Sequence, residues 1–351
     1  MNSFTIGKHT IGPKHPPFIV AEMSGNHNQS LERALKIIDA AAHSGAHAIK
    51  LQTYTPETMT LNVQSADFRI NSKGSLWDGR YLFDLYKDAY TPWEWHKPIW
   101  DHCAKLGIIC FSTPFDESAV DFLESLNTPF YKVASFENTD LPLIRYMASK
   151  KKPMIISTGM ATEQEIQEAV DCAKNAGCPN IVLLKCTSTY PASPENTNIL
   201  TIPYMQKKFQ TLVGLSDHTM GIGVSIASIS LGAVFIEKHF TLSREDGGVD
   251  SSFSMEPEEF HSLVIECERA WKSLGTPTYG ATHAEKPNLQ FRRSLYVAKD
   301  MKAGDLFTKE NVRIIRPGFG IEPKHFEQVL GKKANQDLKI GTALKWDLIL
   351  S

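Results

Sequence analysis

The chain has 351 residues, 42% of them apolar and 22% charged, and its formal net charge is −2. This composition is ordinary for a globular protein, the length allows two domains, and the small net charge gives no sign of binding to nucleic acid or an anionic membrane. No apolar stretch reaches the roughly 18–20 residues of a membrane span, and the N-terminus lacks the apolar core of a signal peptide. Six cysteines show no C-x-x-C pair, so we expect buried, reduced thiols and a cytoplasmic enzyme.

Eight short apolar runs recur along the chain, and helical patterns separate them. They span residues 18–21, 48–51, 108–111, 130–133, 154–156, 181–184, 212–215 and 234–236. Bounded runs of this length suit strands that are buried on both faces, as in a parallel sheet. Eight strand–helix units therefore predict an α/β fold, a (β/α)8 TIM barrel.

The segments between the runs carry helix signals. Apolar residues at a 3.6-residue period predict a helix over 31–42. Thr162 and Glu165 form a capping box at the start of another helix, and Pro257 opens a last one that runs to about residue 273. One interval is longer than a single crossover needs, and its extra segment, 54–90, is rich in aromatic residues. We expect this segment to form a long loop over the mouth of the barrel.

The repeating pattern stops near residue 275. Residues 275–290 have the composition of a linker, and residues 291–351 read as a small β-rich unit with Gly-containing turns. We therefore expect a barrel domain over 1–274, a linker over 275–290 and a small domain over 291–351. From Arg292 onwards, 12 Lys and Arg stand against 7 Asp and Glu, which would suit either a module near an anionic ligand or an ordinary solvated face.

The active site of such a barrel lies at the carboxyl ends of its strands, so the residues that follow each apolar run are candidates. They are Glu22, Lys50, Gln52, Ser112, Thr113, Lys132, Ser135, Glu137, Ser157, Thr158, Gly159, Lys185, Thr187, Ser188, Tyr190, Ser216, Asp217, His218, Glu237, Lys238 and His239. Lysines and hydroxyls are prominent in this set, and they are partners of phosphate and carboxylate groups. Neutral imidazoles on adjacent strand ends can share one divalent metal, so His218 and His239 are predicted metal ligands.

Each candidate also has a structural interpretation. Lys50 and Lys132 could extend from core strands towards solvent, Glu22 could pair with one of them, and hydroxyls often cap helices that follow strands. The residues alone also leave the reaction open, because a metal beside an anion site suits an aldolase, an isomerase or a condensing synthase.

Seven longer motifs stand in chain order at these strand ends. They are Val-Ala-Glu-Met-Ser-Gly-Asn-His-Asn (20–28), Ala-Ile-Lys-Leu-Gln-Thr-Tyr (48–54), Phe-Ser-Thr-Pro-Phe-Asp (111–116), Tyr-Lys-Val-Ala-Ser (131–135), Ile-Ile-Ser-Thr-Gly-Met (155–160), Gly-Leu-Ser-Asp-His-Thr (214–219) and Glu-Lys-His-Phe-Thr (237–241). Together they resemble the sialic acid synthase family. The tail, with Arg-Arg-Ser-Leu-Tyr-Val-Ala (292–298) and Ile-Arg-Pro-Gly-Phe-Gly (315–320), is similar to that family's antifreeze-like (SAF) domain.

The resemblance implies a condensation of phosphoenolpyruvate with an acetamido-deoxy sugar aldehyde, in which phosphate leaves by C–O cleavage. It implies catalytic roles for Glu22, Lys50, Lys132, His218 and His239. It implies phosphoenolpyruvate contacts from Lys50, Gln52, Thr113, Lys132, Ser135, Ser157 and Ser216, and sugar contacts from Glu137, Ser188, Tyr190, Glu237, Asp250 and Arg316. The metal on the two histidines would be Mn²⁺, with Co²⁺ or Mg²⁺ as alternatives, and Arg316 would reach the neighbouring site in a domain-swapped homodimer.

Within the family, residues 20–28 and 76–96 are most similar to the branch whose sugar substrate is 2,4-diacetamido-2,4,6-trideoxy-L-altrose. They are less similar to the branches that make N-acetylneuraminic or legionaminic acid, and Ser188 stands where the first of these commonly has Asn. We expect the aromatic segment 77–86 to receive the methyl group of a 6-deoxy sugar. Two other classes are alternatives: a metal-dependent aldolase, which would release no phosphate, and a glycan- or ice-binding protein, which would not need charged strand ends.

Overall fold

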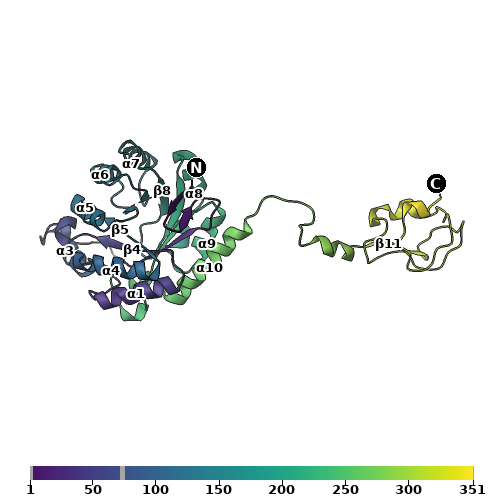
Figure 1. The fold of residues 1–351 in the computed structure, drawn as a ribbon, viewed down its shortest axis with the longest axis horizontal. Helices are drawn as coiled ribbons and strands as arrows, with labels where there is room; N and C mark the ends of the chain where they lie inside the picture. Colours follow the sequence, from purple (N-terminus) through teal and green to yellow (C-terminus); the bar gives the residue numbers. More distant parts are fainter. Residues whose placement is uncertain (1–2, 72–75, 351) are drawn as a thin grey trace. The chain divides into compact units, whose positions relative to one another are not determined.

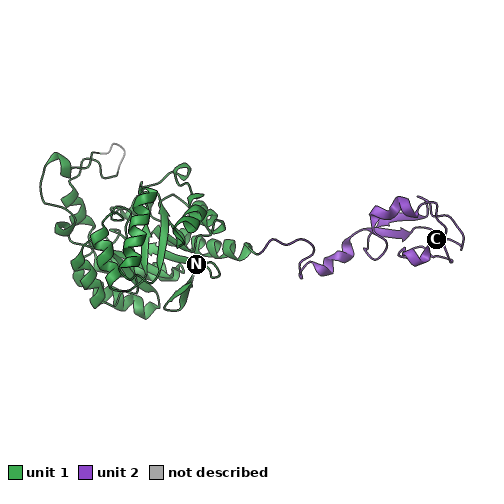
Figure 2. Cartoon of the chain, turned by 90° about the horizontal axis from the view of Figure 1, so that it is seen from above, with its two compact units in different colours: residues 1–275 green, residues 276–351 purple. Residues whose placement is uncertain are grey.

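The computed structural model describes residues 3–71 and 76–350, and the chain divides into two compact units. The first unit spans Met1–Gly275 and the second spans Thr276–Ser351 (Figure 2). Within the described residues, no helix is both long enough and apolar enough to cross a membrane. All six cysteines are unpaired and five of them are buried, as the sequence predicted.

The first unit is built around a closed barrel of eight parallel strands, with helices on its outside (Figure 1). The strands are β3 (Phe18–Glu22), β4 (Ala48–Thr53), β5 (Ile109–Pro114), β6 (Tyr131–Val133), β7 (Met154–Ser157), β8 (Ile181–Cys186), β9 (Leu212–Asp217) and β10 (Phe235–His239). Strand β10 pairs with β3 and closes the ring. The predicted TIM barrel is confirmed, and each predicted apolar run corresponds to one of its strands.

The helices of the first unit lie between these strands. They are α1 (Leu31–His43), α2 (Pro56–Met59), α3 (Leu82–Ala89), α4 (Trp93–Leu106), α5 (Glu117–Ser125), α6 (Leu141–Ser149), α7 (Glu163–Asn175), α8 (Thr201–Phe209), α9 (Gly223–Ser230) and α10 (Pro257–Ser273). The predicted capping box at the start of α7 is present, with Thr162 and Glu165 as its members. Pro257 is the first residue of α10, as its missing N–H favours.

The period of two along each strand divides the core into two layers. One set of side chains faces the helices, as Ile19 and Ile49 do. The alternate set fills the inside of the barrel. Its members are Phe4, Ile6, Ile11, Phe18, Val20, Ala48, Phe111, Phe130, Ile155, Val182, Leu184, Leu212, Val234 and Phe235.

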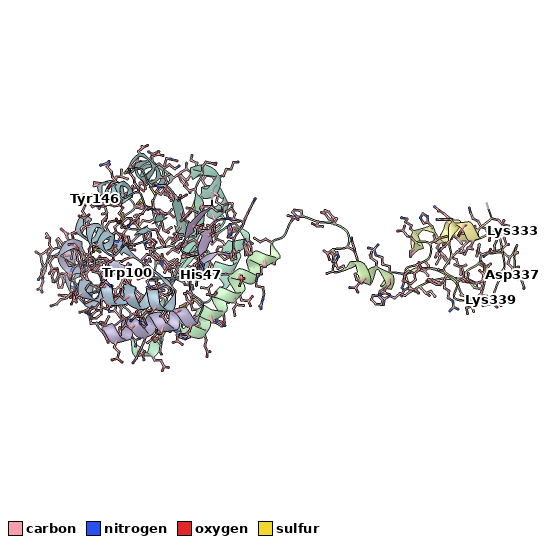
Figure 3. All side chains as sticks on the ribbon, viewed as in Figure 1. His47, Trp100, Tyr146, Lys333, Asp337 and Lys339 are labelled. Carbon is pink, nitrogen blue, oxygen red and sulfur yellow. The ribbon has the colours of Figure 1, made fainter. Side chains whose placement is uncertain are left out.

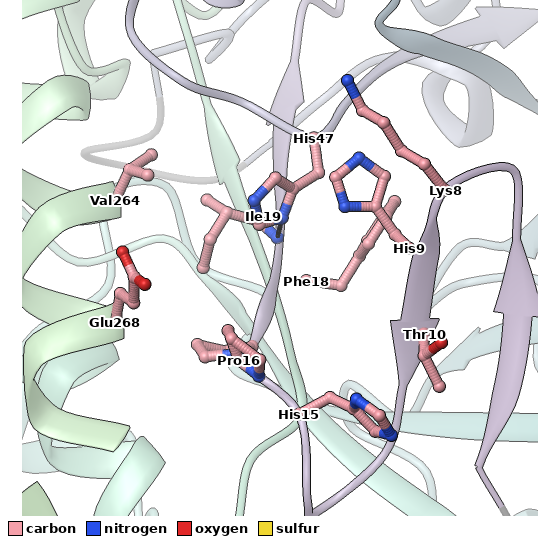
Figure 4. A pocket seen from close by; sticks show the side chains of 11 residues that line it. Lys8, His9, Thr10, His15, Pro16, Phe18, Ile19, His47, Val264 and Glu268 are labelled. Atoms are coloured by element: carbon pink, nitrogen blue, oxygen red, sulfur yellow. Dashed lines mark hydrogen bonds between the residues drawn. The ribbon is translucent and has the colours of Figure 1, made fainter. Parts of the chain in front are cut away.

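A hairpin that precedes the barrel closes its amino end. Strands β1 (Phe4–Ile6) and β2 (His9–Ile11) pair antiparallel, and three of their apolar side chains join the inner layer. Figure 4 shows the pocket between this hairpin and β3, where the rings of His9 and His47 lie with their centroids 4.5 Å apart. The backbone N–H of Ile19 in β3 donates to Nδ1 of His47 at 3.0 Å, which ties β3 to the residue that precedes β4.

The segment between β4 and α4 is more ordered than the loop expected there. It contains α2, α3 and a short 3₁₀ helix, Ala66–Phe68. Its Trp77 indole donates to the backbone oxygen of Val249 at 3.2 Å, and its ring centroid lies 5.7 Å from that of Tyr190. This contact brings the segment to the carboxyl ends of the strands, as predicted.

The second unit has its own small core around strands β11 (Ser294–Val297) and β12 (Val312–Ile315), which pair antiparallel. One short helix, α11 (Phe326–Val329), follows. The surface of the second unit carries ion pairs between exposed side chains, such as Lys339 with Asp300 and Lys302 with Asp337. Figure 3 labels Lys339 and Asp337. Pairs of this kind contribute little stability because water screens them.

Candidate active site

Along each strand, every second side chain faces the inside of the barrel, and this pattern continues beyond the apolar layer. At the carboxyl end of the barrel these inward side chains form a polar layer. On seven of the eight strands, the last inner apolar residue is followed two positions later by a polar or sulfur-containing one; on β9, Gly214 lies between Leu212 and Ser216. The inward residues of this layer are Glu22, Lys50, Gln52, Thr113, Lys132, Ser157, Cys186, Ser216, Glu237 and His239. Most lie within strands that extend one to three residues past the predicted runs, so rigid backbone holds them.

A buried charge cluster occupies the side of this layer formed by β3, β4 and β10. Lys50 Nζ lies 2.9 Å from Glu22 Oε2 and 3.5 Å from Glu237 Oε1, and all three side chains are buried. Burial lowers the pKa of Lys50, but the two carboxylates outweigh it and the net shift is upward. For Glu22, burial raises the pKa by more than Lys50 lowers it. Glu22 therefore retains a proton more readily than an ordinary carboxyl group.

Lys132 is a buried ammonium group without a carboxylate partner. Its Nζ donates to Ser157 Oγ at 2.7 Å and to the backbone oxygen of Val133 at 2.9 Å. No carboxylate of the described residues lies within ion-pair distance of it. Burial is the main cause of its lowered pKa, since a charged group in a low-dielectric interior lacks hydration. Such a group is stabilised by binding an anion.

Beside Lys132, two serine hydroxyls and the backbone of a glycine extend the site. Ser188 Oγ donates to Ser135 Oγ at 2.7 Å. Gly159 has a positive φ of 48°, and a Cβ there would lie 2.5 Å from Ser135 Cβ and 2.8 Å from Ser188 Oγ. Only glycine fits this position, so its backbone can approach a ligand closely.

The two predicted metal ligands lie together. The ring centroids of His218 and His239 are 5.5 Å apart. Nδ1 of His218 lies 2.9 Å from the backbone oxygen of Thr187 and donates to it, and Nε2 of the same ring lies 3.5 Å from Ser216 Oγ. Nδ1 of His239 is buried and has no hydrogen-bond partner.

The protonation of these imidazoles differs. Burial lowers the pKa of His239 well below its usual value, so this ring is neutral. Burial also lowers the pKa of His218, but Cys186, Thr187 and Glu237 outweigh it and the net shift is upward. In the part of the chain that the structure describes, no three His, Cys, Asp or Glu side chains assemble a metal site.

Aromatic rings and two carboxylates line the outer side of the site. The Tyr190 ring lies 4.3 Å from that of His218 and 5.3 Å from that of Phe253. Asp250 is buried and accepts a hydrogen bond from the Ser24 hydroxyl. Glu137 lies beyond β6, where burial raises its pKa to about 7, and its Oε2 has no hydrogen-bond partner.

The structure does not bring every candidate into this site. Asp217 and Lys238 point away from the barrel interior, where Lys238 Nζ lies 3.0 Å from Asp217 Oδ2 and Ser225 of α9 donates to the same carboxylate. The expectation that they share the site with Ser216 and Glu237 is wrong, because neighbouring residues of a strand face opposite sides. Arg316 belongs to the second unit, where it follows β12 and is exposed.

Three side chains at the site were not among the sequence candidates. Cys186 faces inward from β8 and lies beside His218, which lowers the pKa of the thiol to about 7 against the raising effect of burial. Phe253 places its ring 4.9 Å from that of His239, and Ser24 contacts Asp250. The period of two along β8 could have revealed Cys186, whereas the other two depend on contacts between distant parts of the chain.

Comparisons with known proteins agree with this geometry. The NeuB family model matches residues 37–279, and the SAF domain model matches residues 292–350. Pseudaminic acid synthase of Campylobacter jejuni is 46% identical over 328 residues, which cover 93% of this chain and 95% of that protein. N,N'-diacetyllegionaminic acid synthase of Legionella pneumophila is 37% identical, with 95% of this chain and 94% of that protein covered.

Among solved structures, N-acetylneuraminic acid synthetase of Leptospira borgpetersenii, in complex with citrate, superposes with a TM-score of 0.73 at 31% identity. The match covers 83% of this chain and 96% of that one. The family model, the relatives and the shared barrel lead to one conclusion: this chain belongs to the NeuB family and carries a C-terminal SAF domain.

Proposed function

We propose that this chain condenses phosphoenolpyruvate with the open-chain aldehyde of 2,4-diacetamido-2,4,6-trideoxy-L-altrose, giving pseudaminic acid and phosphate. The family supports a phosphoenolpyruvate-dependent synthase. The choice of sugar is supported by the identity of 46% to a pseudaminic acid synthase, against 37% to a legionaminic acid synthase over a similar length.

The observation that carries the proposal is the unpaired, buried ammonium group of Lys132. Phosphoenolpyruvate brings a phosphate and a carboxylate, and lysines and hydroxyls are suitable partners for both. We assign its binding to the inner layer and its rim, namely Lys50, Gln52, Thr113, Lys132, Ser135, Ser157 and Ser216.

The proposed reaction joins C3 of phosphoenolpyruvate to the aldehyde carbon. Positive charge develops at C2, water adds there, and the tetrahedral intermediate expels phosphate with its bridging oxygen. Glu22 accepts the proton of this water, for which a carboxylate of raised pKa is suited. Lys50, 2.9 Å from Glu22, holds that carboxylate in place.

The sugar occupies the outer side of the site in this proposal. Glu137, Ser188, Tyr190, Glu237 and Asp250 bind its polar groups. Its methyl group packs on the aromatic wall that includes Trp77 and Phe253, whose rings flank Tyr190.

The donor set around His218 and His239 fits a divalent metal, for which we propose Mn²⁺. One imidazole nitrogen is oriented by Thr187, and the other ring has a buried nitrogen without a partner. The metal, when bound, would supply a Lewis acid that polarises the aldehyde oxygen.

We also propose a division into a barrel domain over 1–274, a linker over 275–290 and a SAF domain over 291–351, and a domain-swapped homodimer. In this assembly Arg316 of one copy would complete the sugar site of the other. The family resemblance and the exposure of Arg316 support the proposal.

Phosphate release from phosphoenolpyruvate in the presence of Mn²⁺ tests the function, with the altrose derivative and N-acetylmannosamine supplied in parallel. We expect release with the altrose derivative alone. Release with N-acetylmannosamine would assign a different branch of the family, and an aldolase would release no phosphate with either. Lys132→Met should abolish the reaction, whereas Lys185→Met, a matched control on the outer face of β8, should retain it.

A further inference from the structure

Ser24, just after β3, has a backbone conformation that favours glycine. Its φ is 49°, in the left-handed region, where a side chain is disfavoured by about 1–2 kcal/mol. The following residue, Gly25, is pressed against α3, since a Cβ there would lie 3.2 Å from Ala89 Cα. The chain therefore has little room to relax around Ser24. Strain of this kind persists where surrounding contacts impose it, and it is often found beside functional groups.

The Ser24 hydroxyl links the carboxyl ends of β3 and β4 to the loop between β10 and α10. Ser24 is buried, its hydroxyl donates to Asp250 Oδ2, and it accepts from Gln52 Nε2 at 3.3 Å. The same Gln52 amide donates to Glu22 Oε1 at 3.0 Å. An amide nitrogen can only donate and a carboxylate can only accept, so a hydroxyl between them has its direction fixed. The result is one hydrogen-bonded chain from Glu22 through Gln52 and Ser24 to Asp250.

This chain is the main side-chain support of the Asp250 carboxylate. Asp250 lies in the loop between β10 and α10, 226 residues after Ser24. Its carboxylate also receives the backbone N–H of Gly25, so both of these contacts come from the β3 end. Without the hydroxyl, Asp250 keeps a single backbone donor there and Gln52 loses its second acceptor.

We propose that Ser24 is a positioning residue for the second substrate: its strained backbone aims the hydroxyl that fixes Asp250 relative to Glu22. The proposal rests on the proposed function for the identity of the sugar, and on the structure for the hydrogen-bonded chain itself. Glu22 and Asp250 are then one rigid pair of carboxylates across the rim of the site. Losing a hydrogen bond to a charged group typically reduces a rate constant about 10-fold to 100-fold.

Two substitutions distinguish the effect of losing the Ser24 hydroxyl from the effect of relieving the backbone strain at this residue. Ser24→Gly removes both, so relief of the strain should offset part of the lowering of the melting temperature that loss of the hydrogen bond causes, while kcat/KM for the sugar falls about 10-fold or more. Ser24→Ala removes the hydroxyl and keeps the strain, so it should share the kinetic defect and melt below Ser24→Gly. In both variants the KM for phosphoenolpyruvate should stay within about twofold of the parent value. Lys151→Gly, at an exposed residue with φ of 58°, is the matched control for relief of strain and should leave both kinetic constants unchanged.

A double-mutant cycle tests the link without relying on turnover. Thermal melting of Ser24→Ala, Asp250→Asn and the double variant should show a combined shift smaller than the sum of the single shifts, because both changes break the same hydrogen bond. Additive shifts, or a Ser24→Gly variant with parental sugar kinetics, would overturn the proposal. If the parent protein releases no phosphate with either sugar, the proposed function fails, and the cycle alone decides whether Ser24 positions Asp250.

Discussion

The buried pair of Asp217 and Lys238 offers a sharp test of how the barrel separates stability from chemistry. Lys238 Nζ lies 3.0 Å from Asp217 Oδ2, and both side chains are almost fully buried. At an effective dielectric constant of about 20, two unit charges at this distance attract by about 5 kcal/mol. Removing one partner leaves the other charge uncompensated, and such changes typically cost about 3–5 kcal/mol.

Asp217→Asn is the informative substitution, since the amide can still accept from the backbone N–H and hydroxyl of Thr219. We expect the free energy of unfolding, measured in urea, to fall by about 3–5 kcal/mol. Adding Lys238→Met removes the uncompensated buried charge and should restore most of the lost free energy of unfolding. Activity per folded molecule should stay at the parent level in both variants, because the pair faces the helices.

Ser216→Ala is the matched control on the neighbouring residue, whose side chain faces the inside. It should change the free energy of unfolding by less than about 1 kcal/mol and raise the KM for phosphoenolpyruvate about tenfold. The reasoning would be refuted if Asp217→Asn cost less than about 1 kcal/mol, or if it reduced activity as strongly as Ser216→Ala does.

Three further predictions concern the metal, the pH dependence and the two units. His239→Ala should abolish saturable Mn²⁺ binding in titration calorimetry; unchanged affinity would exclude this histidine as a ligand. Burial raises the pKa of Glu137 from 4.5 to about 7, so the folded protein holds a proton that the unfolded chain releases, and stability declines as pH rises through that interval. Glu137→Gln should therefore be more stable than the parent at pH 8 and equal to it at pH 4.5 in urea unfolding. A fragment ending at Gly275 should unfold cooperatively by circular dichroism, because its core is self-contained, and it should lose sugar turnover if Arg316 acts across the dimer.

The strands were predictable because both faces of a barrel strand are covered, which makes each an apolar run bounded by polar residues. Their ends were placed too early. In β4 the run stops at Leu51, yet the strand continues to Thr53. The reason is that the inward positions at the carboxyl end carry polar side chains such as Lys50 and Gln52, so the strand leaves its apolar pattern where the polar layer begins.

The candidate site was predictable in composition and less so in arrangement. Lys132 and the two histidines were identified because they stand at strand ends. Standing at a strand end does not show whether a side chain faces inward or outward, so Asp217 and Lys238 were wrongly placed among the inward residues. The place of Ser24 in its hydrogen-bond network could not be predicted, because it depends on contacts with residues far away in the sequence, including Asp250, 226 positions later. Such contacts follow from closure of the barrel, which no local pattern encodes.

The hairpin of β1 and β2 bears on the direction from which reactants reach the site and on the order in which they bind. Phe4, Ile6 and Ile11 of this hairpin extend the apolar layer that fills the inside of the barrel, so the amino end offers no route to the polar layer. In the proposed reaction, phosphoenolpyruvate held against Lys132 would lie deeper in the site than the sugar held near Tyr190 and Asp250. Under the proposed function, we therefore expect phosphoenolpyruvate to bind before the sugar, and a product held against Lys132 to leave after one held near Tyr190.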